Sequence, residues 1–393
     1  MTTKKLKQII IFLICTLVLI AIMIGYRFYQ NNEQNFNAKQ TYNQNKKTLQ
    51  SNQINKLTTV MDKNDKKISE INNYLEKVKF NGTAAIFEKG QLKLNKGFGV
   101  KNYETGEKNK ADTLYLIGSA QKFTTGLILK QLVNEHKINM NDSITQYLPW
   151  FKTSKPVTLN QLMLHQSGLY KYKASTHYKS LDEAVKAIQH KGIEVEFYNQ
   201  NRYNDANYLV LSRMIEEVTG KSYEMNFKEK LVKPYQLKNT AFFNDETFHQ
   251  VMAEGYKIGE DENHPVKQSP NVLDQYYGAG NLYMTPYDMG ELISSLQYNK
   301  LFEQSITMSL LHESKTFRYP IPYRYGFYSL PDKNRINGGF FGQVFTAYFN
   351  DNYIVVLGTN YENSSINNEK KMKHIYYNLL NQGGPYNIVG QRY

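Results

Sequence analysis

Ser119 and Lys122 lie three residues apart, at the start of an apolar helical pattern over residues 123–133. On a helix, residues i and i+3 share one face, so the serine hydroxyl and the lysine ammonium can meet without help from another element. A serine becomes a good nucleophile when a base takes its proton. A lysine can be that base only if burial or the positive end of a helix dipole lowers its pKa. Taken alone, the pair is explained more simply as a solvated helix start.

A second motif, Tyr203-Asn204-Asp205, stands just before another predicted helix. A phenol beside a serine and a lysine can relay a proton, and a short polar side chain can hold the lysine ammonium. The chain has 32 tyrosines, so similar tripeptides arise by chance. Taken alone, this motif is better explained as coincidence.

A third motif, Asn337-Gly338-Gly339-Phe340, falls on a predicted late strand. Two adjacent glycines let a substrate approach the backbone, whose N–H groups can stabilise an oxyanion. The alternative is a plain glycine pair in a hairpin or bulge. Tyr277 is a further candidate to line the site, with core packing as an equal alternative.

The elements that must position these motifs follow from hydrophobic periodicity. Helices are predicted over residues 65–78, 158–164, 206–218, 286–296 and 369–380. Strands are predicted as a hairpin within 82–94 and at 335–340, 343–349 and 353–359. Strands at both ends around a mainly helical middle predict an α+β fold, with one antiparallel sheet formed by N- and C-terminal segments.

The N-terminal part differs in composition from the rest. Three lysines within the first seven residues precede a nearly unbroken apolar run, 9–24. We interpret 1–30 as an uncleaved transmembrane anchor that leaves the C-terminus outside the cell, with a cleaved signal peptide as the alternative. Residues 31–64 are rich in Asn, Gln, Lys and Thr and are predicted to be a disordered linker. Residues 65–393 are then the folded domain.

The chain carries 48 Lys and Arg against 35 Asp and Glu, a net charge of +13. This charge favours polyanionic surroundings such as nucleic acid, anionic lipid or a wall polymer. The positive residues are scattered and form no nucleic-acid-binding motif, so nucleic acid is not an expected partner. The single Cys lies in the apolar run, and the eight His show no metal-ligand spacing, so neither a metal nor another cofactor is expected.

The order of the three motifs resembles the serine β-lactamase and penicillin-binding-protein family, especially its class C-like branch. Collateral segments resemble the same branch and are more specific than the motifs: 162–169 (LMLHQSGL), 207–223 and 278–285. Together they cover roughly residues 80 to 360 in the family's order. The resemblance implies a serine β-lactamase-like fold for the domain.

Finer matches at 118–123, 203–205, 274–281 and 337–343 resemble the members of this family that remove D-alanyl esters from teichoic acids. The resemblance implies that Ser119 forms an acyl-enzyme while Lys122, Tyr203 and Asp205 manage protons. By the same analogy, the N–H groups of Ser119 and Phe340 would form the oxyanion hole. It also implies teichoic acid as the substrate polymer and β-lactams as weak ligands.

Two positions depart from the usual family pattern. Asp205 stands where an Asn is common, and a carboxylate there would raise the pKa of Lys122 unless it shares in the proton transfer. Asn337 stands where a Lys or His usually begins the third motif, so the cation that would meet a peptide carboxylate is missing. Both favour an ester of D-alanine. The alternatives are a low-affinity penicillin-binding protein or D-alanyl-D-alanine carboxypeptidase, and a non-catalytic wall-polymer-binding protein.

Overall fold

The computed structural model describes residues 56–258, 265–314, 316–362 and 367–389. The predicted anchor, 1–30, and most of the predicted linker lie outside these residues. Within them, no helix combines the length and apolar character needed to cross a bilayer.

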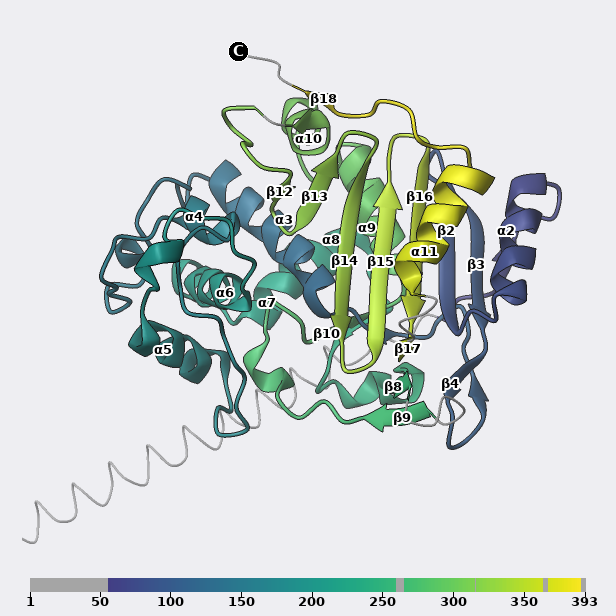
Figure 1. Cartoon of the computed structure of the whole chain (residues 1–393), viewed down its shortest axis with the longest axis horizontal. Helices are drawn as coiled ribbons and strands as arrows, with labels where there is room; N and C mark the ends of the chain where they lie inside the picture. The colour runs from purple at the N-terminus through teal and green to yellow at the C-terminus, as the bar shows by residue number, and fades with distance from the viewer. Residues whose placement is uncertain (1–55, 259–264, 315, 363–366, 390–393) are drawn as a thin grey trace, which may run out of the picture. The chain divides into compact units, whose positions relative to one another are not determined.

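The centre of the fold is an eight-stranded antiparallel sheet with the strand order β1-β3-β2-β16-β15-β14-β13-β12 (Figure 1). Strand β2 pairs with β16 over its whole length, so the N- and C-terminal parts of the described chain meet in mid-sheet. This confirms the predicted α+β architecture. The strands are β1 (Val60–Met61), β2 (Gly82–Glu88), β3 (Gln91–Phe98), β12 (Tyr323–Arg324), β13 (Phe327–Leu330), β14 (Lys333–Phe340), β15 (Gln343–Phe349) and β16 (Tyr353–Thr359).

The sheet begins inside the segment predicted as a linker. Val60 of β1 pairs with Asn95 of β3, and Lys93 Nζ lies 3.1 Å from a carboxylate oxygen of Asp62. A two-residue strand adds too little apolar character to stand out from a polar composition. Its order comes from the backbone groups that the edge of β3 offers.

Helices cover both faces of the sheet because its strands are apolar on both faces. Ala84 and Ile86 pack with α2 and α11 on one face, whereas Ala85 and Phe87 join the larger core that contains α3 and α9 on the other. The alternation follows from the two-residue side-chain period of a strand. The helices are α2 (Lys66–Lys77), α3 (Gln121–Asn134), α4 (Leu159–Met163), α5 (Leu181–Lys191), α6 (Asp205–Thr219), α7 (Tyr223–Phe227), α8 (Lys233–Tyr235), α9 (Pro286–Gln297), α10 (Gln304–His312) and α11 (Asn368–Lys373).

Helices α4, α5 and α6 form a helical region beside the β12–β14 side of the sheet (teal in Figure 1). Local sequence explains where they begin and end. Thr158 and Gln161 form a capping box at the start of α4. Gly220 ends α6 in the left-handed conformation, with φ of 64°. Both ends were predicted from the sequence.

Short strands complete the described fold and form smaller sheets, among them β6-β10-β7 and β17-β8-β9. They are β4 (Val100–Asn102), β5 (Glu107–Lys108), β6 (Tyr115–Leu116), β7 (Thr240–Phe242), β8 (Gly255–Ile258), β9 (Pro265–Gln268), β10 (Leu282–Met284), β11 (Glu313–Ser314), β17 (Tyr361–Glu362) and β18 (Ile388–Val389). Strand β6 matters most for the site, because it leads directly into the turn that carries Ser119.

Candidate active site

Ser119 lies in a 3₁₀ turn, η1 (Gly118–Ala120), that runs directly into α3. Lys122 is in the first turn of α3 and is fully buried. Its Nζ donates to Ser119 Oγ at 3.0 Å and to the carbonyl of Ala279 at 3.2 Å. The structure therefore brings the predicted serine and lysine together on one helical turn.

Asp205, the first residue of α6, accepts a hydrogen bond from Lys122 Nζ at 2.7 Å. Burial alone would lower the pKa of Lys122, but the charge of Asp205, with a contribution from Tyr203, outweighs it and raises that pKa above its ordinary value. Lys122 is therefore an ammonium at neutral pH. Burial alone therefore does not turn Lys122 into a neutral base. The raised pKa is the effect that the sequence predicted for a carboxylate at position 205.

Tyr203 stands over this ammonium with 43% of its surface exposed. Its ring centre lies 5.1 Å from Lys122 Nζ, and the ring packs on His165 at 4.4 Å between centroids. His165 is buried, and its Nδ1 accepts the backbone N–H of Asn204 at 3.2 Å. Burial, with the charge of Lys122, holds the pKa of His165 well below its usual range. His165 is therefore neutral and holds the turn that presents Tyr203.

The third motif touches η1 through its glycines. A methyl group placed on Gly338 would overlap the carbonyl oxygen of Ile117 and lie 2.8 Å from the Ser119 nitrogen. Gly118 has φ of +52°, and a methyl group there would lie 3.0 Å from the carbonyl carbon of Gly339. Such a close approach of β14 to the nucleophile requires glycine on both sides.

The strand register decides which N–H of β14 faces the nucleophile. The N–H of Asn350 donates to the carbonyl of Tyr353 at 3.0 Å, which identifies a hydrogen-bonded pair of the β15–β16 ladder. Along an antiparallel strand, successive residues direct their backbone groups to opposite neighbours. Gln343 lies seven residues before Asn350, an odd number, so the backbone N–H and C=O of Gln343 face β14 rather than β16. Gln343 is paired with Phe340, and the N–H of Phe340 therefore points into the sheet. The N–H of Gly339 points to the other edge.

That other edge is open, because β13 pairs with β14 only as far as Arg335. Gly339 thus offers its backbone N–H on the edge of β14 that lies against η1, and it is the candidate second donor beside the N–H of Ser119. The prediction that Phe340 supplies the second donor is wrong. Its ring packs against Tyr276 instead, at 4.9 Å between centroids.

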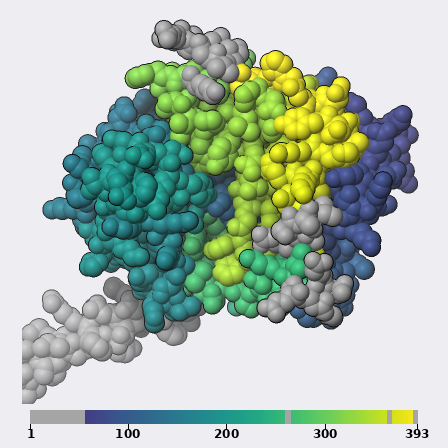
Figure 2. All heavy atoms as spheres, viewed as in Figure 1, coloured from purple at the N-terminus to yellow at the C-terminus, as the bar shows by residue number. Residues whose placement is uncertain are grey.

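A cavity of about 310 Å³ opens at this point. In the space-filling view, the surface is hollowed between the teal helical region and the light-green strands (Figure 2). The nine described residues that line the cavity are Ser119, Tyr203, Tyr323, Gly326, Tyr328, Arg335, Asn337, Gly338 and Gly339.

Asn337 and Tyr277 were both predicted to line the site, and only Asn337 does. Asn337 lines the cavity and accepts a hydrogen bond from the Thr346 hydroxyl at 2.9 Å. Tyr277 does not line it, and its ring packs against Phe242 at 5.3 Å between centroids. Sequence reasoning missed Arg335, Tyr323 and Tyr328, because no motif marks them. Gly326 could have been suspected from its place between two short strands.

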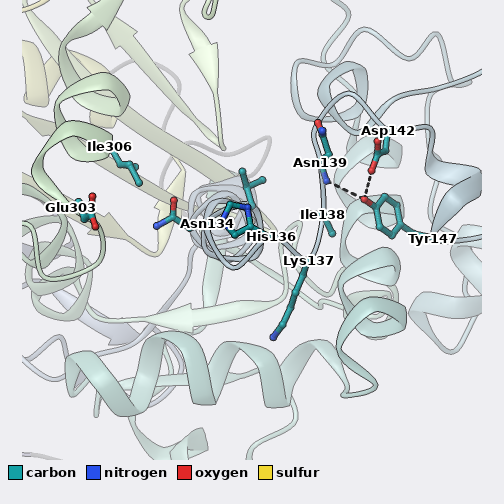
Figure 3. Close-up of a pocket in the computed structure, with 10 residues that line it drawn as sticks. Asn134, His136, Lys137, Ile138, Asn139, Asp142, Tyr147, Glu303 and Ile306 are labelled. Carbon is teal, nitrogen blue, oxygen red and sulfur yellow. Dashed lines mark hydrogen bonds between the residues drawn. The ribbon is translucent and has the colours of Figure 1, made fainter.

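A larger cavity of about 800 Å³ lies at the C-terminal end of α3 (Figure 3). Its lining includes Asn139, Asp142 and Tyr147, and the Tyr147 hydroxyl donates to Asp142 at 2.6 Å. No candidate catalytic residue belongs to it. Within the described residues, no group of three or more His, Cys, Asp or Glu is arranged to hold a metal ion.

Buried charge, a nucleophile and converging backbone donors meet only at the smaller of these two cavities. This is the arrangement that acyl transfer requires, since a serine can attack a carbonyl whose oxygen two N–H groups then stabilise.

Comparisons with known proteins agree with this geometry. Residues 69–374 match the family model described as Beta-lactamase. The chain is 56% identical over 335 residues to "Teichoic acid D-alanine hydrolase" of Staphylococcus aureus (strain NCTC 8325 / PS 47), covering 85% of this chain and 83% of that protein. It is 49% identical over 397 residues to the protein of the same name from strain MRSA252, covering 98% of each.

The fold agrees as well. The crystal structure of FmtA from Staphylococcus aureus superposes with a TM-score of 0.83 at 55% identity, covering 86% of this chain and 93% of that one. On the matched range and these identities, the chain belongs to the Beta-lactamase family.

Proposed function

We propose that this chain is a cell-wall serine esterase that removes D-alanyl esters from teichoic acids through an acyl-enzyme on Ser119. The observation that carries the proposal is the fully buried Lys122, which bridges Ser119 and Asp205 beside two backbone donors. The relatives named for hydrolysis of teichoic acid D-alanine support the choice of substrate.

The proton route must account for a lysine that is charged at rest. In our proposal, Nζ passes a proton to Asp205 across their 2.7 Å contact and takes the proton of Ser119 across 3.0 Å. Ser119 Oγ then forms a bond to the ester carbonyl carbon. The carbonyl oxygen becomes an oxyanion that accepts hydrogen bonds from the N–H groups of Ser119 and Gly339. The bond from the carbonyl carbon to the leaving oxygen breaks, and that oxygen takes a proton from Lys122, directly or through Tyr203. A water molecule then gives a proton to Lys122 while its oxygen bonds to the acyl carbon. The bond to Ser119 Oγ breaks, Oγ takes that proton back, D-alanine leaves, and Asp205 returns its proton to Nζ.

The neutral third motif supports an ester substrate. Asn337 carries no charge, and Ile336, on the same face of β14 as Gly338, is fully buried and apolar. A D-alanyl-D-alanine peptide ends in a carboxylate, which a cation would bind by a charge-assisted hydrogen bond. A D-alanyl ester instead carries a free ammonium. Asp205 keeps 31% of its side chain exposed and can help to attract that ammonium while substrate binds, before the carboxylate takes the proton of Lys122.

We further propose that residues 1–30 anchor the protein in the cell membrane, with 31–64 as a tether and the catalytic domain facing the wall. The support is the apolar run 9–24 behind a lysine cluster. Mass spectrometry of the membrane-bound protein tests this, and we expect the run to remain attached. A mature N-terminus after Tyr26 would show a cleaved signal peptide instead.

The decisive experiment compares kcat/KM for a D-alanyl ester of teichoic acid with kcat/KM for a D-alanyl-D-alanine peptide. We expect a clear preference for the ester. We also expect added salt to weaken activity on the polymer more than on a small neutral ester, because only the polymer is attracted over a distance by a +13 chain. Preference for the peptide would indicate a carboxypeptidase. Polymer binding without any release would indicate a non-catalytic binder.

A further inference from the structure

Arg335 is the only charged residue among the nine described residues that line the cavity at Ser119. It lies on β14, and 24% of its side chain is exposed. Lys122 is buried beneath the site, where Asp205 pairs with it. An anionic part of a substrate in this cavity would therefore meet Arg335, the one cationic side chain among the described residues that line it.

The guanidinium of Arg335 is held in place from one side. Its Nε and Nη2 donate to the same oxygen of Glu369, at 3.3 and 3.1 Å. The other oxygen of Glu369 accepts the Tyr348 hydroxyl, which fixes the carboxylate in turn. The guanidinium carbon also lies 5.5 Å from the centre of the Tyr328 ring. An arginine held along one edge keeps further N–H groups for a second oxyacid, and its planar fork suits phosphate.

The distance between Arg335 and the nucleophile decides whether Arg335 can bind a phosphate of the polymer or the terminal carboxylate of a peptide. Arg335 stands four residues before Gly339, the candidate donor to the scissile carbonyl, which is roughly 13 Å in a strand. In a D-alanyl-D-alanine peptide, the carboxylate lies only one residue, roughly 3.5 Å, beyond the scissile carbonyl. The pairing with Glu369 of α11 keeps Arg335 from swinging toward the nucleophile. A polymer that continues along the cavity reaches it, whereas a terminal carboxylate next to the scissile bond does not.

We propose that Arg335 binds a phosphodiester of the wall polymer next to the unit whose D-alanyl ester is cleaved, and so sets the position of the polymer over Ser119. This inference rests on the proposed esterase function and adds a named phosphate subsite to it. Asn337, between Arg335 and the donors, would face the neutral part of the repeat.

The test uses the full chain with Arg335→Gln, Arg335→Lys and, as matched control, Arg213→Gln. Arg213 is similarly exposed, at 19%, and is likewise paired with carboxylates, but it lies on α6 outside the cavity. We measure kcat/KM for D-alanine release from teichoic acid and for a small neutral D-alanine ester. Arg335→Gln should lower the value for the polymer about tenfold or more, and the value for the small ester much less. Arg335→Lys should recover part of the loss, and Arg213→Gln should change neither value.

A second readout separates failure of this inference from failure of the proposed function. Binding of D-alanine-free teichoic acid is measured for Ser119→Ala with and without Arg335→Gln, and thermal unfolding checks that each variant is folded. We expect Arg335→Gln to weaken binding about tenfold and to reduce its salt dependence. Equal losses on both esters, or unchanged polymer binding, would overturn the phosphate subsite. Absence of D-alanine release by the unaltered protein would overturn the esterase function, while the binding measurement would still decide the role of Arg335.

Discussion

Two cavities among the described residues can be compared, because the larger one lacks the chemistry of the smaller. The cavity of about 800 Å³ lies at the end of α3, and its polar groups satisfy one another, as Tyr147 and Asp142 do. The cavity of about 310 Å³ lies where two helix starts and the open edge of a strand converge. It places a buried ammonium between a hydroxyl and a carboxylate.

The difference teaches that volume alone is a poor guide to a catalytic site. A perturbed pKa in a cleft with converging donors is the better criterion, because it requires an arrangement that packing alone does not produce. Changes at the smaller cavity should therefore alter the chemistry, whereas changes at the larger one should alter only stability.

The largest effect is expected from Ser119→Ala. The change removes the attacking hydroxyl and should lower D-alanine release by several orders of magnitude, since loss of a nucleophile is rarely compensated. Release of D-alanine from teichoic acid measures it, and circular dichroism checks the fold. Ester hydrolysis at the original rate by a well-folded variant would end the proposed mechanism.

Gly338→Ala should have the next largest effect. The added methyl group would overlap the carbonyl oxygen of Ile117, so β14 must move away from η1. A displacement of about 1 Å at the donors costs roughly 100-fold in rate. The control is Gly384→Ala, whose methyl group meets nothing within 4 Å. Equal kcat for both variants would show that the close approach at Gly338 is not needed.

Asp205→Asn should change the pH dependence of kcat/KM. Burial lowers the pKa of Lys122, and the charge of Asp205 is the largest influence that raises it. In the proposed route, Lys122 starts as an ammonium and passes its proton to Asp205. Without that acceptor, Lys122 can act as a base only after it has lost its proton to solvent, so the acidic limb should move to higher pH. Asp142→Asn in the larger cavity is the control and should leave the profile unchanged. An unmoved limb in Asp205→Asn would show that this carboxylate is not coupled to the reaction.

The smallest effect is expected at the larger cavity. Tyr147→Phe removes a hydroxyl that donates to Asp142 and accepts the N–H of Asn139. The free energy of unfolding should fall by about 1 kcal/mol, the usual net value of such a bond. Thermal unfolding measures this, and esterase activity should remain as it was. A marked loss of activity would contradict the contrast between the two cavities.

Much of the scaffold could be predicted because its signals are local. A few neighbouring residues are enough to specify the capping box at Thr158, the glycine after α6 and the limits of β15 and β16. The pairing of Ser119 with Lys122 is also local, since one helical turn brings them together. Strand β1 has no such signal, and only the edge of β3 gives it order.

The sequence by itself predicted Ser119 as the candidate nucleophile, Lys122 and Asp205 as its candidate partners, and the α+β class of the fold. Only the tertiary structure decided that Gly339, rather than Phe340, faces the nucleophile, and that Arg335 joins the cavity while Tyr277 does not. The reason is the two-residue period of a strand, by which a shift of one residue reverses the direction of each backbone and side-chain group. Which direction meets the site depends on where η1 lies against β14, and η1 comes from a segment far away in the chain.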